Sequence, residues 1–206
     1  MSRTQSFKTL STAAEALIRE KGSKFYAFAW PVRNEQEIKE KLEAMRKKYF
    51  DASHHCYAYV LGADKKIYRA NDDGEPNHSA GDPILGQIRS LDLSNVLVLV
   101  LRYFGGRKLG VGGLIQAYRA AAAAALANGS IVEEEVKAYY ELNFAYAHTP
   151  DVMRLIKMQE ADILSQQFEA ACSMKIAVKI KHIDVLLQKI DLLNKTGTEI
   201  YISEIT

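Results

Sequence analysis

The chain has 206 residues, 48% of them hydrophobic and 25% charged, with a formal net charge of +2. This is the composition of an ordinary globular protein, and the absence of any run of 18 apolar residues excludes a transmembrane helix. The sequence begins without the apolar core of a secretion signal, and its two cysteines, Cys56 and Cys172, lie far apart and outside any C-x-x-C motif. We therefore expect a reduced, cytoplasmic protein.

The charges are unevenly distributed along the chain. Residues 1–130 contain 19 Lys and Arg against 13 Asp and Glu, whereas residues 131–206 contain 8 against 12. The net charge changes sign at the tripeptide Asn128-Gly129-Ser130. Such a tripeptide is typical of the end of a helix. We predict two separable domains, residues 1–132 and 133–206, with their boundary between Asn128 and Val136. The basic first domain is the better candidate for binding a polyanion.

The first domain mixes strands and helices. Asn34 is expected to cap a helix with Glu37 as its capping-box partner, and the helix has an apolar stripe from Ile38 to Tyr49. The segment 95–104 is almost continuously apolar, which is typical of a strand covered on both faces. A helix with six consecutive alanines from Ala120 is expected to approach the sheet closely. The remaining elements are strands at 23–32, 54–62 and 65–71 and a helix at 82–92.

The second domain has the element order βαββαβ. Strands are expected at 133–147, 161–170, 173–180 and 198–205. One helix is expected to start with Thr149 as its cap and Pro150 at its first position, and the other to carry the stripe Ile183 to Leu193 and stop at Gly197. This order in about 70 residues is the ferredoxin-like pattern, an antiparallel sheet with two helices on one face. The fold class is therefore α+β.

An acidic loop, residues 72–82, concentrates unusual residues. Asp72, Asp73, Glu75 and Asp82 are the type of oxygen ligands that Mg²⁺ and Ca²⁺ prefer, but their spacing matches no known cation loop. The segment D-D-G-E-P is also good turn chemistry, because Gly74 accepts a positive φ and Pro76 stiffens the exit. A structural loop and an exposed functional loop remain the favoured alternatives.

Zinc and cysteine chemistry are both weakly supported. His54, His55, Cys56 and His78 are possible zinc ligands, but adjacent histidines on a strand point to opposite faces. We therefore predict that His54 and His55 do not bind one metal together. No nucleophile elbow or oxyanion loop accompanies Cys56, so no catalytic residue, metal or cofactor is predicted.

A glycine loop, residues 105–113, lies between the buried strand and the alanine-rich helix. Its glycines allow backbone N–H groups to approach an anion, and a helix start near Val111 adds partial positive charge. The loop matches neither the P-loop nor G-x-G-x-x-G, so a tight turn and a phosphate or nucleic-acid contact both remain open. The predicted anion-binding residues are Arg102, Tyr103, Gly105, Gly106, Arg107, Lys108, Gly110, Gly112 and Gly113.

Long ordered motifs in these loops resemble the YigZ/IMPACT family. They are D-D-G-E-P at 72–76, S-A-G-D-P-I-L at 79–85 and R-Y-F-G-G-R-K-L-G-V-G-G-L-I-Q-A-Y at 102–118, with H-H-C-Y-A-Y at 54–59 upstream. The resemblance covers residues 18–126, and the tail is similar to the small C-terminal domain of bacterial members.

The resemblance implies a fold and a field of activity. The first domain is expected to have the left-handed βαβ fold of elongation factor G domain IV and of GHMP kinases, and the tail to resemble domain V of the same factor. Eukaryotic relatives regulate translation initiation by competing for an activator of a stress kinase. No catalytic activity is carried over, and nucleic-acid or ribosome binding is suggested for bacterial members by their fold alone.

One departure from the family pattern lies in the acidic loop. Where family members commonly have small residues before T-A-G, this chain has Asn77, His78 and Ser79, so His78 adds bulk and a titratable group. We expect the two loops to face one another, with carboxylates pairing to Arg102 or Arg107. The residues expected to shape or serve this loop are Asp72, Asp73, Gly74, Glu75, Pro76, His78, Ser79 and Gly81.

Three functions compete. The leading hypothesis is a non-enzymatic module that binds RNA, the ribosome or a translation factor and regulates translation. The second is a binder of phosphate-containing small molecules, or an enzyme acting on them, that uses the glycine loop. The third is a protein-interaction adaptor, as in the eukaryotic relatives. A net charge of +6 in the first domain favours the first hypothesis, although no long basic stripe accompanies it.

Overall fold

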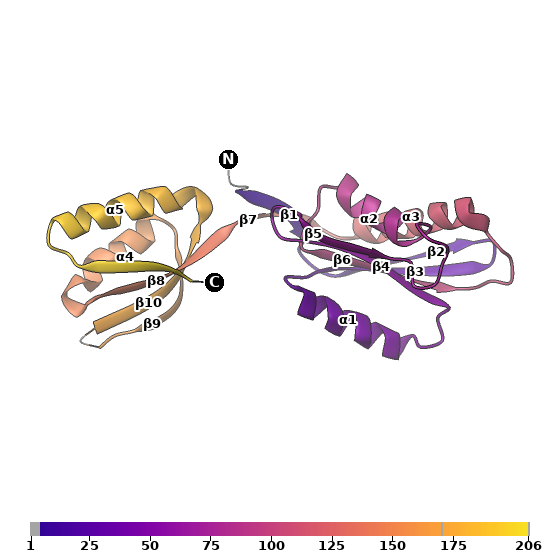
Figure 1. Ribbon diagram of the computed structural model, residues 1–206, viewed down its shortest axis with the longest axis horizontal. Helices are drawn as coiled ribbons and strands as arrows, with labels where there is room; N and C mark the ends of the chain where they lie inside the picture. Colours follow the sequence, from indigo (N-terminus) through magenta and orange to yellow (C-terminus); the bar gives the residue numbers. More distant parts are fainter. Residues whose placement is uncertain (1–4, 170, 206) are drawn as a thin grey trace. The chain divides into compact units, whose positions relative to one another are not determined.

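The computed structural model describes residues 5–169 and 171–205. The described chain divides into two compact units, drawn in Figure 1. The N-terminal unit is Phe7–Glu134, and the C-terminal unit contains Gln5 and Ser6 together with the residues from Glu135 onward. None of the described helices combines the length and the apolar composition that crossing a membrane requires.

The N-terminal unit is built on a five-stranded antiparallel sheet in the order β2-β3-β6-β4-β5. A separate two-stranded sheet pairs β1 with β7. The elements in chain order are β1 (Ser6–Leu10), β2 (Ala14–Glu20), β3 (Ser23–Pro31), α1 (Glu35–Lys48), β4 (His54–Leu61), β5 (Ile67–Asn71), α2 (Gly81–Ser90), β6 (Val96–Tyr103), α3 (Gly110–Asn128) and β7 (Ile131–Glu135).

Helices cover both faces of this sheet, with α1 on one side and α2 and α3 on the other (Figure 1). The side chains of the central strand β6 point alternately to these two faces. Leu97, Leu99 and Leu101 pack in the cluster beneath α1, whereas Val96, Val98 and Val100 pack in the cluster beneath α2 and α3. The sequence prediction of a strand buried on both faces is confirmed.

The alanine run gives α3 a flat face. Ala121, Ala122 and Ala125 are fully buried in the cluster that includes Phe25, Ala27 and Ala29 of β3. Small side chains on both partners allow the helix to lie close to the sheet, as the sequence predicted. The alanines therefore serve packing.

Strands β3 and β4 flank β6, and both run antiparallel to it. They are therefore parallel to each other and joined by α1, which makes β3-α1-β4 a βαβ crossover. Asn34 caps α1 as predicted, since its Oδ1 accepts a hydrogen bond from the N–H of Glu37. The Glu37 carboxylate reaches back to the N–H of Arg33 rather than to Asn34.

The C-terminal unit shows the predicted βαββαβ order. Its four-stranded antiparallel sheet has the order β11-β8-β10-β9, and its helices bury Tyr140, Leu142 and Phe144 of β8 together with Met174 of β10. The elements are β8 (Lys137–Ala145), η1 (Tyr146–His148), α4 (Thr149–Met158), β9 (Asp162–Gln167), β10 (Ala171–Lys179), η2 (Ile180–His182), α5 (Ile183–Lys195) and β11 (Ile200–Ile205).

Two further local predictions were wrong, and two strands were not predicted. The sequence analysis missed β1 and β2, and the single strand expected at 133–147 is split into β7 and β8, with Val136 between them. Thr149 does not cap α4, because His148 occupies the cap position and the Thr149 hydroxyl donates to the Tyr146 carbonyl. A 3₁₀ turn before the helix provides that carbonyl, and no sequence pattern had indicated it.

Candidate functional site

The acidic loop is held in shape by its own carboxylates. Asp72 Oδ1 accepts hydrogen bonds from the N–H groups of Ala80 (2.9 Å) and Gly81 (2.8 Å), and its Oδ2 accepts one from the N–H of His78 (2.9 Å). Helix α2 begins at Gly81, and Ala80 offers it no capping side chain. Asp72 therefore caps α2 from a distance of eight residues in the chain.

Asp73 ties the loop to α1 and β4. Its carboxylate accepts hydrogen bonds from Arg46 Nη2 (2.7 Å) and from the N–H of His55 (2.6 Å). Burial opposes ionisation of Asp73, but the hydrogen bonds from Arg46 and His55 outweigh it, so the pKa of this carboxyl lies below its usual value. Each oxygen of this carboxylate thus accepts one hydrogen bond from the chain.

Glu75 turns inward. Its side chain is only 4% exposed, and its Oε1 accepts from Arg102 Nη1 (2.7 Å) and from the Tyr118 hydroxyl (2.8 Å). The Cys56 thiol extends this network, because it lies within hydrogen-bond distance of the Tyr118 hydroxyl (3.3 Å) and of the Asp72 carbonyl (3.0 Å). Burial is the main cause that raises the pKa of both Cys56 and Tyr118, so both stay protonated at neutral pH.

The remaining loop residues also maintain the turn. The Ser79 hydroxyl is buried and donates to the Pro76 carbonyl. A Cβ on Gly81 would lie 2.5 Å from the backbone nitrogen of Asn71, so only glycine fits there. Gly74 and His78 have positive φ, and the exposed ring of His78 contacts the Asp82 carboxylate through Nδ1 at 2.6 Å.

The two adjacent histidines of β4 lie apart from one another's partners. The rings of His54 and His55 lie with different carboxylates: His54 Nε2 is 3.8 Å from Glu75 Oε1, and His55 Nδ1 is 3.9 Å from Asp73 Oδ2. Within the part of the chain that the structure describes, no group of three His, Cys, Asp or Glu has metal-binding geometry. The prediction that His54 and His55 share no metal ion stays open to measurement.

The glycine loop has a packed half and an open half. Gly105 belongs to the packed half, because a Cβ there would lie 1.9 Å from the backbone carbon of Gly22, and its N–H donates to the Ser23 hydroxyl. Glycine is required at position 105 because two backbone segments approach one another closely there. Gly113 is also confined, with a Cβ contact of 3.1 Å to Leu109.

The open half is exposed around the start of α3. A Cβ on Gly106, Gly110 or Gly112 would meet nothing within 4 Å. Arg107 and Lys108 are exposed and make no ion pair with any described residue. No side chain caps α3 and no acidic residue lies in its first turn. Its first N–H groups therefore lack intrahelical partners and carry the positive end of the helix dipole.

The two loops share one cavity of about 350 Å³, which we call the glycine-loop cavity. Its lining includes Pro76 and Glu75 from the acidic loop and Lys108, Val111 and Leu114 from the glycine loop and α3. The predicted arrangement of two loops facing one another is thus present, and Arg102 rather than Arg107 pairs with a loop carboxylate.

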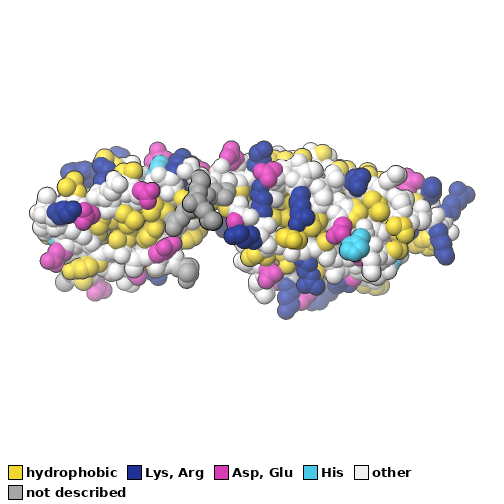
Figure 2. All heavy atoms as spheres, turned by 45° about the horizontal axis from the view of Figure 1, so that its top comes forward, with side chains coloured by type: hydrophobic (Ala, Val, Ile, Leu, Met, Phe, Trp, Pro, Cys, Tyr) yellow, Lys and Arg dark blue, Asp and Glu magenta, His cyan; other side chains and the backbone are white. Residues whose placement is uncertain are grey.

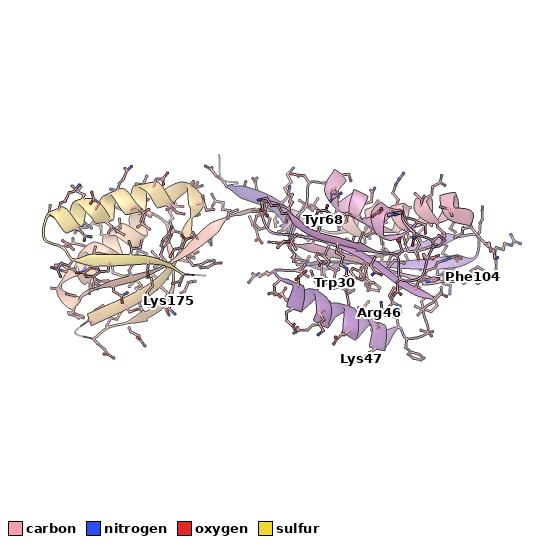
Figure 3. The ribbon with its side chains drawn as sticks, viewed as in Figure 1. Trp30, Arg46, Lys47, Tyr68, Phe104 and Lys175 are labelled. Carbon is pink, nitrogen blue, oxygen red and sulfur yellow. The ribbon has the colours of Figure 1, made fainter. Side chains whose placement is uncertain are left out.

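A second cavity of about 350 Å³, the tyrosine cavity, adjoins the first. Tyr26, Tyr49 and Tyr103 line it together with Lys24 and Asp51. Phe104 lines both cavities, and Figure 3 shows it at the right-hand end of the N-terminal unit. Figure 2 shows Lys and Arg side chains at the right-hand end of the N-terminal unit. Lys21, Lys24, Arg107 and Lys108 are all exposed.

The predicted site residues therefore separate by role. Arg102 is 7% exposed and committed to Glu75, and the Tyr103 hydroxyl donates to Asp51 Oδ1 at 2.8 Å. Sequence reasoning missed Tyr26, Tyr49 and Tyr118 as parts of these sites. The aromatic-rich segment 23–32 indicated a strand, but only the pairing of β3 with β6 places Tyr26 beside Tyr103.

Comparison with known proteins identifies the relationship. A family model described as the Impact N-terminal domain matches residues 21–126, which include both loops and both cavities. The chain belongs to the IMPACT family. The resemblance seen in the loop motifs is confirmed, and the bacterial members below extend it beyond the matched domain.

Two bacterial family members illustrate the similarity. IMPACT family member YvyE of Bacillus subtilis is 39% identical over 131 residues, which cover 64% of this chain and 60% of that protein. IMPACT family member YigZ of Escherichia coli is 31% identical over 139 residues, covering 66% of this chain and 68% of its relative. The alignment with YvyE thus spans less than two thirds of the length of YvyE.

A solved structure carries the similarity along almost the whole chain. A crystal structure described as that of a hypothetical protein has a TM-score of 0.76 and 25% sequence identity, covering 98% of both chains. This supports the α+β fold with separate sheets in both units. These relatives establish the family.

Proposed function

We propose that this IMPACT family member is a non-enzymatic cytoplasmic protein that binds RNA, the ribosome or a translation factor and so regulates translation. The observation that carries the proposal is the open half of the glycine loop. There, Arg107 and Lys108 have full positive charge with no ion-pair partner among the described residues, beside the uncapped N-terminus of α3. These are the groups that bind phosphate in nucleic-acid complexes.

The chemistry of the buried network supports binding rather than catalysis. Cys56, Tyr118 and Glu75 are buried and hydrogen-bonded to one another or to Arg102. The pKa of Cys56 is raised, whereas a nucleophilic cysteine needs a lowered one. Both cysteines are free and buried, which agrees with a reducing compartment.

The fold adds an analogy to this proposal. We infer that the β3-α1-β4 crossover has the left-handed connection of elongation factor G domain IV, and that the C-terminal unit corresponds to the ferredoxin-like domain V of that factor. Elongation factor G works on the ribosome. Similarity to two of its domains is therefore consistent with a ligand that is RNA or the ribosome.

A second candidate, binding of a phosphate-containing small molecule, is favoured by the glycine-loop cavity. That cavity lies against Lys108 and the start of α3 and offers apolar walls from Pro76, Val111 and Leu114. A mononucleotide competing with RNA would bind there. The third candidate, a protein adaptor, is distinguished by a partner that is retained after RNase treatment of a lysate.

The test is RNA binding by the full chain and by the double variant Arg107→Ala, Lys108→Ala, measured by fluorescence anisotropy at two salt concentrations. The loss of two phosphate contacts is expected to weaken binding by about one to a few kcal/mol and to reduce the salt dependence by roughly one unit per contact. Lys39→Ala with Lys47→Ala, two exposed lysines of α1, removes the same charge elsewhere as a control.

Two results would contradict the proposal. One is a folded Arg107→Ala, Lys108→Ala variant that binds RNA as tightly as the unmodified chain at both salt concentrations. The other is an equal loss in the α1 control, because binding would then follow net charge and not the glycine loop.

A further inference from the structure

Phe104 belongs to both cavities. Its side chain lines both the glycine-loop cavity and the tyrosine cavity, and half of its surface is exposed. The guanidinium of Arg102 lies 5.6 Å from the centre of its ring, in a cation–π contact. The Phe104 side chain therefore contributes to both cavities, and the Arg102 guanidinium lies over its ring.

One residue that lines the glycine-loop cavity has a buried donor without a partner among the described residues. Arg102 lines the cavity, its side chain is 7% exposed, and its Nε finds no hydrogen-bond partner among the described residues. A buried N–H without a partner carries a desolvation cost, which an acceptor on a ligand would remove. Together with the uncapped start of α3 and Lys108, this donor indicates a ligand that is anionic and rich in acceptors.

The tyrosine cavity favours a planar aromatic group. Tyr26 and Tyr103 meet edge to face, with ring centres 5.8 Å apart, and Tyr49 and Phe104 complete the aromatic lining. Burial and the hydrogen bond to Asp51 raise the pKa of Tyr103 to about 12, so its hydroxyl remains neutral at physiological pH. Aromatic walls of this kind stack nucleobases without regard to their identity.

The charges around both cavities complement a phosphate backbone. Lys24 at the tyrosine cavity and Lys108 at the glycine-loop cavity form no ion pair within the described residues. The carboxylates that line the cavities are both engaged, Asp51 by the Tyr103 hydroxyl and Glu75 by Arg102. The surface between the cavities thus has unpaired positive charge and no unpaired negative charge in its lining.

We propose that the two cavities hold two successive bases of a single strand of RNA, both in contact with the Phe104 side chain, with the backbone phosphate at Lys108 and the first turn of α3. The inference rests on the proposed function and specifies its ligand. The aromatic tyrosine cavity, the adjoining apolar glycine-loop cavity and the lysines beside them fit planar groups joined by an anion, a pattern that a single-stranded polynucleotide repeats along its length. Paired bases in a duplex are stacked and cannot enter.

The first experiment compares ligands. A fluorescein-labelled 12-nucleotide oligouridylate is titrated with the full chain, beside a blunt RNA duplex, an abasic oligomer and oligothymidylate, all of matched length. We expect the single strand to bind on the order of tenfold more tightly than the duplex and the abasic oligomer, because stacking contributes for each base. Weaker binding of oligothymidylate identifies RNA as the occupant.

The outcomes separate the inference from the proposed function. Equal binding of the duplex or of the abasic oligomer overturns the base pockets but leaves an RNA-binding protein. Equal or tighter binding of oligothymidylate overturns RNA as the occupant. Failure of every oligomer to bind overturns both the base pockets and RNA binding by this chain.

The second experiment substitutes Phe104, which lines both cavities. Phe104→Ala is expected to lose about tenfold in affinity for oligouridylate, and Phe104→Trp is expected to retain it, because a larger ring still stacks. Phe50→Ala is the matched control, since Phe50 is 83% exposed and lines neither cavity. Full affinity in Phe104→Ala, or an equal loss in Phe50→Ala, overturns the role of Phe104. Thermal unfolding of each variant verifies that it is folded.

Discussion

Arg102 and Glu75 form an ion pair of 2.7 Å whose side chains are 7% and 4% exposed. This contact joins the end of the central strand β6 to the acidic loop, 27 residues earlier in the chain. It also explains why Arg102, a basic residue beside the glycine loop, does not stand free on the surface. Its charge balances a buried carboxylate, while Arg107 and Lys108 remain exposed.

Removal of one member of this pair is expected to be costly. Arg102→Met leaves the Glu75 carboxylate buried without its cation, and we expect a loss of about 3–5 kcal/mol in the free energy of unfolding. Glu75→Gln with Arg102→Met removes both charges and should be less destabilising than the sum of the two single variants. Urea unfolding measures all three. Additive losses would show that the two charges act independently.

Two glycines of the glycine loop should respond oppositely to alanine. Gly105→Ala places a Cβ 1.9 Å from the backbone of Gly22, so we expect a loss of several kcal/mol or failure to fold. Gly112 lies in α3 with open space around its Cβ position. Gly112→Ala should therefore stabilise the chain by up to about 1 kcal/mol. Denaturant unfolding of both variants tests this, and a stable Gly105→Ala chain would refute the close approach.

The larger substitution Gly112→Val separates folding from binding. It is expected to weaken RNA binding more than the Arg107→Ala, Lys108→Ala change, because its side chain covers the N–H groups at the start of α3. Anisotropy measures the affinity, and the unfolding free energy of the same sample is the stability control. Unchanged affinity in a folded Gly112→Val chain would mean that these N–H groups do not contact the ligand.

Acid is expected to destabilise the N-terminal unit in two steps. Burial and the charge of Arg46 hold the pKa of His55 below its usual 6.5, so its contribution is complete above that pH and is lost as the pH falls through the folded-state value. Asp73 has a pKa below 3.8 and acts in the same direction at lower pH. His55→Gln should flatten the first step, seen in urea unfolding between about pH 7.5 and 5. His148→Gln should leave it unchanged.

Both cysteines are expected to be unreactive in the folded protein. Only the thiolate attacks disulfide reagents, and burial raises the pKa of the Cys56 thiol while Cys172 is 1% exposed. With Ellman's reagent at about pH 8 we expect no rapid reaction until denaturant is added, after which two thiols react. Ser90→Cys, at an exposed position, is the positive control. Rapid native reaction of Cys56 would show that the loop opens.

Much of the fold follows from local patterns. The apolar run of β6, the alanine face of α3 and the Asn34 cap were predicted because each depends on residues close together in the chain. Strands β1 and β2 were missed for the opposite reason. The pattern of β2, a mixture of half-buried and exposed residues, gives a weak strand signal, and its pairing with β3 decides its structure.

The candidate site depended more on distant contacts. Sequence motifs pointed to both loops, yet the capping of α2 by Asp72 and the inward turn of Glu75 depend on contacts that no spacing reveals. Tyr26 and Tyr103 are 77 positions apart in the numbering and meet only through the β3–β6 register. Family motifs can mark such residues as a set, but only the folded chain separates those that shape the loop from those that face solvent.

The prediction of two separable folding units has a direct test. The compact units divide at Glu134 and Glu135, and Gly129, Ser130 and Val136 lie outside the helices and strands. A nonspecific protease should cut between Asn128 and Val136 before it cuts elsewhere, and the larger fragment should unfold cooperatively by itself. Cleavage elsewhere first, together with one unfolding transition for the whole chain, would contradict separable units.

The hydrogen bonds from Asp72 to Ala80 and Gly81 close residues 72–81 into a ring. Surface loops usually tolerate insertions and deletions, because their two ends are fixed and the chain between them is free. Here a carboxylate spans the loop, and adding or removing one residue would carry the helix start away from its cap. The number of residues in this loop is thus as constrained as their identity, and changes in loop length during evolution should be confined to other connections of the fold.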